Sequence, residues 1–88
     1  MSFPCPCCAY LTMPKLRGSC GICPICLWED DLEQWDDPDD ADGANHVSLN
    51  EARENYRRHA VSDLLNPGRQ RAPLREEIPP GIAKQPPQ

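Results

Sequence analysis

The sequence lacks the long apolar segments that cross or enter a membrane. No apolar run approaches the roughly 20 residues that a membrane-spanning helix needs. The N-terminus, MSFPCPCC, has neither the basic nor the apolar region of a secretory signal. We therefore expect a cytoplasmic protein with no membrane partner. Thiols stay reduced in the cytoplasm, so clustered cysteines there more often bind metal than form disulfides.

Large core-forming side chains are also scarce. The 88 residues include only five aromatic residues, against eleven prolines and six cysteines. A chain this short rarely buries enough apolar surface to fold without a metal or disulfides. We expect a small metal-stapled α+β fold. Residues 1–66 should form a zinc-knuckle plus helix domain, and residues 67–88 a Pro-rich extended tail.

Basic residues are missing from the middle of the chain. Residues 29–42 hold nine acidic side chains and no basic one, and the net charge is −5. The repeated Asp and the Pro38 within this acidic segment favour an irregular loop. Such a field repels nucleic acid and suits a basic protein partner. The segment is not an EF-hand, because placing Gly43 at the sixth position would put Leu49 where the bidentate Glu belongs.

Catalytic motifs are absent from the sequence as well. No Ser/His/Asp order and no phosphate-cradling glycine loop stands out. His46 and His59 follow the acidic segment and are typical of structural or solvated histidines. We expect a protein that is not an enzyme.

The cysteines, by contrast, form a repeated pattern. Cys5-Pro6-Cys7-Cys8 and Cys23-Pro24-Ile25-Cys26 are two C-x₂-C units with 14 residues between them. Each such turn delivers two thiolates, and Zn²⁺ takes four ligands in a tetrahedron. We predict one Zn²⁺ per chain on four ligands: Cys5, Cys8, Cys23 and Cys26. Iron in a rubredoxin-like site is the alternative, although rubredoxin knuckles lie much further apart in sequence.

Two cysteines, Cys7 and Cys20, are left over by this ligand set. They are expected to be small buried or half-exposed residues, with a redox pair or a swapped ligand as the alternative. Between the knuckles, residues 10–12 and 19–22 have short-strand character and predict a zinc-ribbon-like hairpin.

One helix is clearly predicted after the acidic segment. Ser48 suits the N-cap, and Glu51 completes a capping box. Apolar residues then recur at helical spacing. They are Leu49, Ala52, Tyr56 and Ala60. The helix should end between residues 59 and 65.

The acidic segment and its two tryptophans are the candidate partner-binding surface. Trp28 is expected to pack beside the second knuckle, and Trp35 to be an exposed anchor, because Trp is enriched at binding hot spots. The predicted binding residues are Trp28, Glu29, Asp30, Asp31, Trp35, Asp36, Asp37, Asp39 and Asp40. A merely solvated loop is the alternative.

Three separated blocks, CPCCAYLT, ICPICLWEDD and GANHVSLNEARENY, resemble the small bacterial cysteine-rich CPCC proteins. The resemblance runs over residues 3–56, and residues 73–80 are expected to continue it. The family pattern places cysteines at Cys5, Cys7, Cys8, Cys23 and Cys26, and glycine is more usual at Ala9. The resemblance implies a zinc-ribbon-like knuckle with an appended helix, but no activity. Some members stand beside toxin genes, which hints at an immunity role.

Three functions are compatible with these features. The first is a non-enzymatic, zinc-stabilised acidic module that binds a basic protein, such as an immunity protein against a nuclease-like toxin. The second is a nucleic-acid-associated zinc ribbon, for which basic residues near the knuckles are few. The third is a rubredoxin-like or thiol redox protein. The sequence does not name the partner or the oligomeric state.

Overall fold

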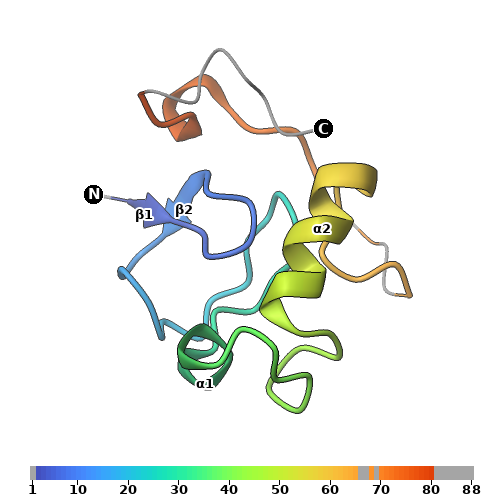
Figure 1. Ribbon diagram of the computed structural model, residues 1–88. Coiled ribbons are helices and arrows are strands. Elements are labelled where there is room, and N and C mark those ends of the chain that lie inside the picture. Colours follow the sequence, from blue (N-terminus) through green and yellow to red (C-terminus); the bar gives the residue numbers. More distant parts are fainter. Residues whose placement is uncertain (1, 66–67, 69, 81–88) are drawn as a thin grey trace.

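The computed structural model describes residues 2–65, 68 and 70–80. Along the chain come β1 (Phe3–Pro4), β2 (Leu11–Met13), α1 (Leu32–Asp36), α2 (Leu49–His59) and a 3-10 helix, η1 (Arg75–Glu77). Figure 1 shows α2 beside the cysteine-containing turns and α1, which lies within the acidic segment, at the lower edge of the view, away from β1 and β2. The structure is thus a small α+β fold, as predicted. No helix in the described part of the chain is long and apolar enough to cross a membrane.

The two strands flank the first cysteine turn. β1 pairs antiparallel with β2, and Phe3 lies opposite Met13. The hairpin predicted between residues 10–12 and 19–22 is therefore wrong. Residue 22 instead forms an isolated antiparallel bridge with Glu29, across the second cysteine turn. Each C-x₂-C turn reverses the chain, so the nearest partner of each strand lies on the other side of its own turn.

Helix α2 was the element best predicted from the sequence. Ser48 caps it by accepting a hydrogen bond from the Glu51 N–H at 3.0 Å. Leu49, Ala52 and Tyr56 are buried, as their spacing indicated. The helix ends at His59, and Ala60 follows in the left-handed conformation with φ of 63°. This reversal turns Ala60 out to solvent, and Val61 occupies the core instead.

The acidic segment contains a helix that the sequence did not predict. α1 spans five residues, and Asp31 caps it by accepting a hydrogen bond from the Glu33 N–H at 2.9 Å. Gln34 on this helix is completely buried. The repeated Asp that favoured an irregular loop thus supplies the N-cap.

Part of the Pro-rich tail packs against the cysteine module. The Arg71 N–H donates to the Pro24 carbonyl at 3.2 Å, η1 contacts β2, and Ile78 packs on the core. In Figure 1 these residues run back over β1 and β2. Residues 75–77 are helical rather than extended. A domain boundary at residue 66 stays a prediction, and residues 81–88 of the predicted tail lie outside the described residues.

Candidate metal centre

The two cysteine turns have the same backbone conformation. In knuckle 1 (residues 5–10), the Cys5 N–H donates to the Tyr10 carbonyl at 2.8 Å, and the Ala9 N–H donates to the Cys5 carbonyl at 2.9 Å. In knuckle 2 (residues 23–28), the bonds from Cys23 to Trp28 and from Leu27 to Cys23 measure 2.9 and 2.8 Å. The sequence repeat is therefore a structural repeat.

Each knuckle also requires one left-handed residue. Ala9 and Leu27, each directly after the second cysteine of its C-x₂-C pair, both have φ of 70°. Left-handed backbone is unfavourable for residues with a Cβ and favours glycine. The glycine that the resemblance implies at position 9 would suit this conformation.

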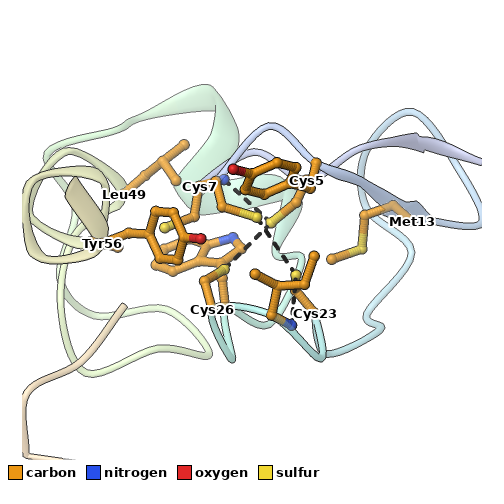
Figure 2. Packing of buried hydrophobic residues seen from close by; sticks show 12 residues of the cluster. Cys5, Cys7, Met13, Cys23, Cys26, Leu49 and Tyr56 are labelled. Carbon is orange, nitrogen blue, oxygen red and sulfur yellow. Dashed lines mark hydrogen bonds between the residues drawn. The ribbon is translucent and has the colours of Figure 1, made fainter. Parts of the chain in front are cut away.

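The knuckles bring four sulfur atoms together. The Sγ atoms of Cys5, Cys8, Cys23 and Cys26 all lie within 4.8 Å of one another, and all four side chains are buried. The Sγ atoms of Cys5 and Cys26 are 3.6 Å apart, and those of Cys8 and Cys23 are 3.7 Å apart. Figure 2 shows the labelled Cys5, Cys23 and Cys26 grouped between Met13 on one side and Leu49 and Tyr56 on the other.

These separations fit a metal ion better than disulfides. Disulfide sulfurs lie about 2.05 Å apart. Four sulfurs at about 2.3 Å from a tetrahedral zinc would be about 3.8 Å from one another. The observed 3.6 and 3.7 Å match the second arrangement. The four cysteines can therefore hold one metal ion.

The electrostatics of the cluster also call for a cation. Hydrogen bonding to Cys23, together with burial, raises the pKa of Cys8. Hydrogen bonding to Cys23 and Cys5 raises the pKa of Cys26. The pKa of Cys23 is lowered, because the other three thiols, Cys26 first, donate to its thiolate. A bound metal cation would allow all four thiols to lose their protons.

Hydrogen-bond donors around the sulfurs complete the site. The Cys7 N–H donates to the Sγ of Cys5, and the Ile25 N–H donates to the Sγ of Cys23, each at 3.4 Å. The Thr12 hydroxyl lies 3.2 Å from the same Cys23 sulfur. Such donors stabilise thiolate charge and orient the ligands. Thr12 was missed in the sequence, where only its place just after knuckle 1 could have indicated it.

The repeat explains the extra cysteine of knuckle 1. Cys7 occupies the position that Ile25 has in knuckle 2, and the two residues are 9% and 1% exposed. Cys7 is thus placed as a small buried residue and does not belong to the four-sulfur cluster. Cys20 is exposed, with φ of 62°.

A second organised region surrounds the buried amide of Gln34. Its Nε2 donates to the carbonyls of Asp40 and Val47 at 2.8 and 2.9 Å. Its Oε1 accepts from the N–H and the Nδ2 of Asn45 at 3.2 and 2.8 Å. All four hydrogen-bonding positions of the amide are therefore used. Residues 40–47 are held in a fixed arrangement around this one side chain.

Asn45 connects this network to knuckle 2. Its Oδ1 accepts from the Glu29 N–H at 2.9 Å, and its Nδ2 donates to the Glu29 carbonyl at 2.8 Å. The side chain thus bonds with Glu29 as a neighbouring strand would. Asn45 and Glu29 are 16 residues apart in the sequence. A single sequence gives no signal for such a pairing.

Close packing also restricts the residue type at Gly43, two residues before Asn45. A Cβ on Gly43 would lie 2.4 Å from the Oδ2 of Asp31 and 2.5 Å from the Cγ of Gln34. The same Asp31 oxygen accepts from the Ala44 N–H at 2.7 Å. Gly43 is therefore needed because α1 approaches the backbone closely.

The predicted partner-binding residues divide into two groups. Trp28 and Asp30 are 1% and 0% exposed, so their side chains are not on the surface, and we remove them from the candidate set. The Oδ2 of Asp30 instead accepts from the Ser19 N–H at 2.8 Å. The remaining predicted residues are exposed or half-buried: Glu29, Asp31, Trp35, Asp36, Asp37, Asp39 and Asp40.

Trp35 is not the free anchor that we expected. It is half-buried, packs against the core, and has the Arg17 guanidinium over its ring at 5.4 Å from the centroid. This cation–π contact ties α1 to the segment that links the two knuckles.

No curated protein matches the chain. The family described as "Cysteine-rich CPCC", however, matches residues 3–77, which include both knuckles, α1, α2 and η1. The match extends the resemblance noted in the sequence into the C-terminal segment. The chain therefore belongs to the cysteine-rich CPCC family.

Proposed function

We propose that this protein is a non-enzymatic, zinc-stabilised module that binds a basic protein partner through its acidic surface. One specific form of this function is an immunity or inhibitor protein that occupies the basic substrate groove of a nuclease-like toxin. Six free cysteines and no disulfide among the described residues suit a reducing, cytoplasmic environment.

Zinc is the proposed metal. Four thiolates fill a tetrahedral shell and leave no position for substrate, as in structural zinc sites. Iron would also accept this ligand set, so metal analysis of the protein purified from its native host is the first test. Iron, or a number of free thiols that changes with redox conditions, would favour the redox function instead.

The main support for the binding function is the order of the acidic segment. Like charges repel, and although Asp30 and Asp31 have structural roles, these do not explain the exposed acids among the nine in residues 29–42. Yet the buried Gln34 and Asn45 hold this segment in place, while Asp36, Asp37 and Asp39 point into solvent as exposed residues. A rigid, exposed acidic surface loses little entropy on binding and attracts basic partners.

The test uses two matched double variants as bait in affinity purification. Asp36→Asn with Asp37→Asn neutralises the surface, whereas Glu51→Gln with Glu76→Gln removes the same charge from exposed positions elsewhere. We expect one basic protein to be captured by the wild type and by the second variant, but not by the first. Capture should weaken as salt screens the charges.

Other results would contradict the proposal. Equal capture by both variants would show that the acidic surface is only solvated. Capture of RNA or DNA in place of a protein would favour the nucleic-acid function.

A further inference from the structure

A small pocket lies between knuckle 2 and the segment that follows α2. Its volume is about 140 Å³, and it is lined by Ile22, Leu27, Glu29, Ala44, Asn45, His46, Ser62 and Asp63. Pockets for drug-sized molecules measure about 300–1,000 Å³. The size of this pocket therefore suits a single side chain rather than a metabolite.

The walls of the pocket are of two kinds. Ile22, 62% exposed, and the half-buried Leu27 provide apolar surface. Glu29 and Asp63 are acidic residues of the lining from two different segments of the chain, and His46 lines the pocket as well. Neither carboxylate has an ion pair within the described residues, where the basic partners of all ion pairs are Arg57, Arg58 and Arg71. Two uncompensated anionic groups beside apolar surface are suited to a long cationic side chain with an aliphatic stem.

Ser62 also lines the pocket and is 2% exposed. Its N–H donates to the Cys26 carbonyl at 2.8 Å, and its carbonyl accepts from Asn55 at 2.9 Å. The Ser62 hydroxyl has no partner among the described residues, and it is not fully enclosed, because the fully buried side-chain atoms without a partner there are the Nε1 of Trp28 and the Oδ1 of Asp30. A ligand with several N–H groups would supply a partner for this hydroxyl.

The pocket is held in shape by the rest of the fold. Asn45 fixes the backbone of Glu29, and the Leu65 N–H donates to the Oδ1 of Asp63 at 3.0 Å. The other oxygen of Asp63 and both oxygens of Glu29 make no hydrogen bond in the part of the chain described. The acceptors are thus positioned before any ligand arrives, which lowers the entropy lost on binding.

From these contacts we infer that the pocket receives an arginine side chain of the partner protein. The planar guanidinium carries five N–H donors, enough for Glu29, Asp63 and the Ser62 hydroxyl at once, and its stem would lie on Leu27 and Ile22. Lysine offers only three donors around a compact charge. This inference rests on the proposed function and gives that basic partner one defined anchor.

The experiment is an NMR titration of the ¹⁵N-labelled, metal-loaded protein with acetyl-arginine amide. Acetyl-citrulline amide, which has nearly the same shape without the charge, and acetyl-lysine amide are the controls. We expect saturable shifts for the amides of residues 29, 46 and 63 with arginine, weaker ones with lysine and none with citrulline. Glu29→Gln and Asp63→Asn should each weaken binding about tenfold, while Glu76→Gln, which changes an exposed acid outside the pocket lining, should not.

Three outcomes would overturn the inference: no saturable shift up to the solubility limit of the arginine probe, equal shifts with citrulline, or equal shifts with Ca²⁺ or Zn²⁺, which would indicate a metal site. The affinity purification described under the proposed function has an outcome that does not depend on this titration. If Asp36→Asn with Asp37→Asn abolishes capture but the arginine probe does not bind, the acidic surface binds the partner without this pocket.

Discussion

Knuckle 1 and knuckle 2 share their backbone and hydrogen bonds but have different surroundings. Knuckle 1 is flanked by the paired strands β1 and β2. Its Pro6 carbonyl accepts from the Nε of Arg53 on α2 at 2.9 Å, and Tyr10 meets Tyr56 edge to face with the ring centroids 6.4 Å apart. Regular secondary structure thus fastens knuckle 1.

Knuckle 2 is held by single contacts from many segments. The Ser62 N–H donates to Cys26, the Arg71 N–H to Pro24, and Asn45 bonds with the adjoining Glu29. These partners come from the connections outside α2 and from the tail. The pocket and the acidic surface lie on this side. The comparison indicates that one knuckle anchors the fold while the other presents a surface that irregular segments can shape.

The largest effect is expected from removing the metal ion, which both knuckles bind. Cys5→Ser and Cys23→Ser each delete one ligand, from different knuckles. Because structural zinc contributes about 10–16 kcal/mol of apparent binding free energy, far more than a core this small, both variants should lose the metal and unfold to the same extent. Circular dichroism with metal analysis checks this, and Cys20→Ser is the control. A variant that stays folded after losing a ligand would show that its knuckle is stable alone.

A smaller effect should separate the knuckles. Asn45→Ala leaves the Glu29 N–H and carbonyl without their partner and should cost about 2 kcal/mol of unfolding free energy. Arg53→Ala removes one partly exposed bond to knuckle 1 and should cost about 1 kcal/mol. Chemical denaturation gives the energies, and hydrogen exchange gives the location. Faster exchange in both knuckles for either variant would contradict separate fastening.

The sequence predicts those structural elements that depend on residues close together in the chain. It does not predict those that depend on distant residues. The four ligands follow from two C-x₂-C turns, and α2 follows from Ser48 and its apolar spacing, so both could be predicted. The strand pairing could not be predicted, because each knuckle pairs the residue segments that precede and follow it, rather than segments of the connection between the knuckles. α1 has five residues, too few for a periodic pattern, and its stability depends on the distant partners of Gln34.

The burial of Asp30 was equally hard to foresee. This residue belongs to a run of acidic residues that the sequence indicates to be solvent-exposed. The backbone of Asp30 pairs with Cys20 and Gly21, at 3.0 and 2.9 Å, and this pairing draws the side chain inward. The partner of the proposed function is harder still to predict from the sequence. Its identity would depend on a surface to which separate segments of the chain contribute.

The tail offers a pH-dependent contact to knuckle 2. Glu77 and Arg71 form paired hydrogen bonds at 2.8 Å, and hydrogen bonding to Arg71 lowers the pKa of Glu77. A carboxyl with a lowered folded-state pKa stabilises the fold above its unfolded pKa, and this contribution is lost as the pH falls through the folded-state value.

We therefore expect the protection of residues 70–80 against hydrogen exchange to decrease below about pH 4. Glu77→Gln should produce the same change at neutral pH. The effect on unfolding free energy should stay below about 1 kcal/mol, because Arg71 is partly exposed. No change in exchange at knuckle 2 would show that the tail does not fasten it.

The smallest effect compares the two left-handed residues. Ala9→Gly relieves backbone strain at an exposed position and should stabilise the protein by about 0.5 kcal/mol, the strain relief being partly offset by the flexibility of glycine. Leu27→Gly relieves the same strain but removes a half-buried side chain, and should destabilise by about 1 kcal/mol. Thermal denaturation with saturating metal measures both. If the melting temperatures of both variants shift in the same direction, the surroundings of the knuckles differ less than the structure indicates.

The central claim is that two repeated knuckles hold one metal ion on four specified sulfurs. Native mass spectrometry of the protein from its own host tests this most directly, because it counts and identifies the bound ion in each chain. We predict one zinc per chain in the wild type, in Cys7→Ser and in Cys20→Ser, and none in Cys8→Ser. A folded chain without metal, a chain with two ions, or loss of the ion in Cys20→Ser would contradict the account.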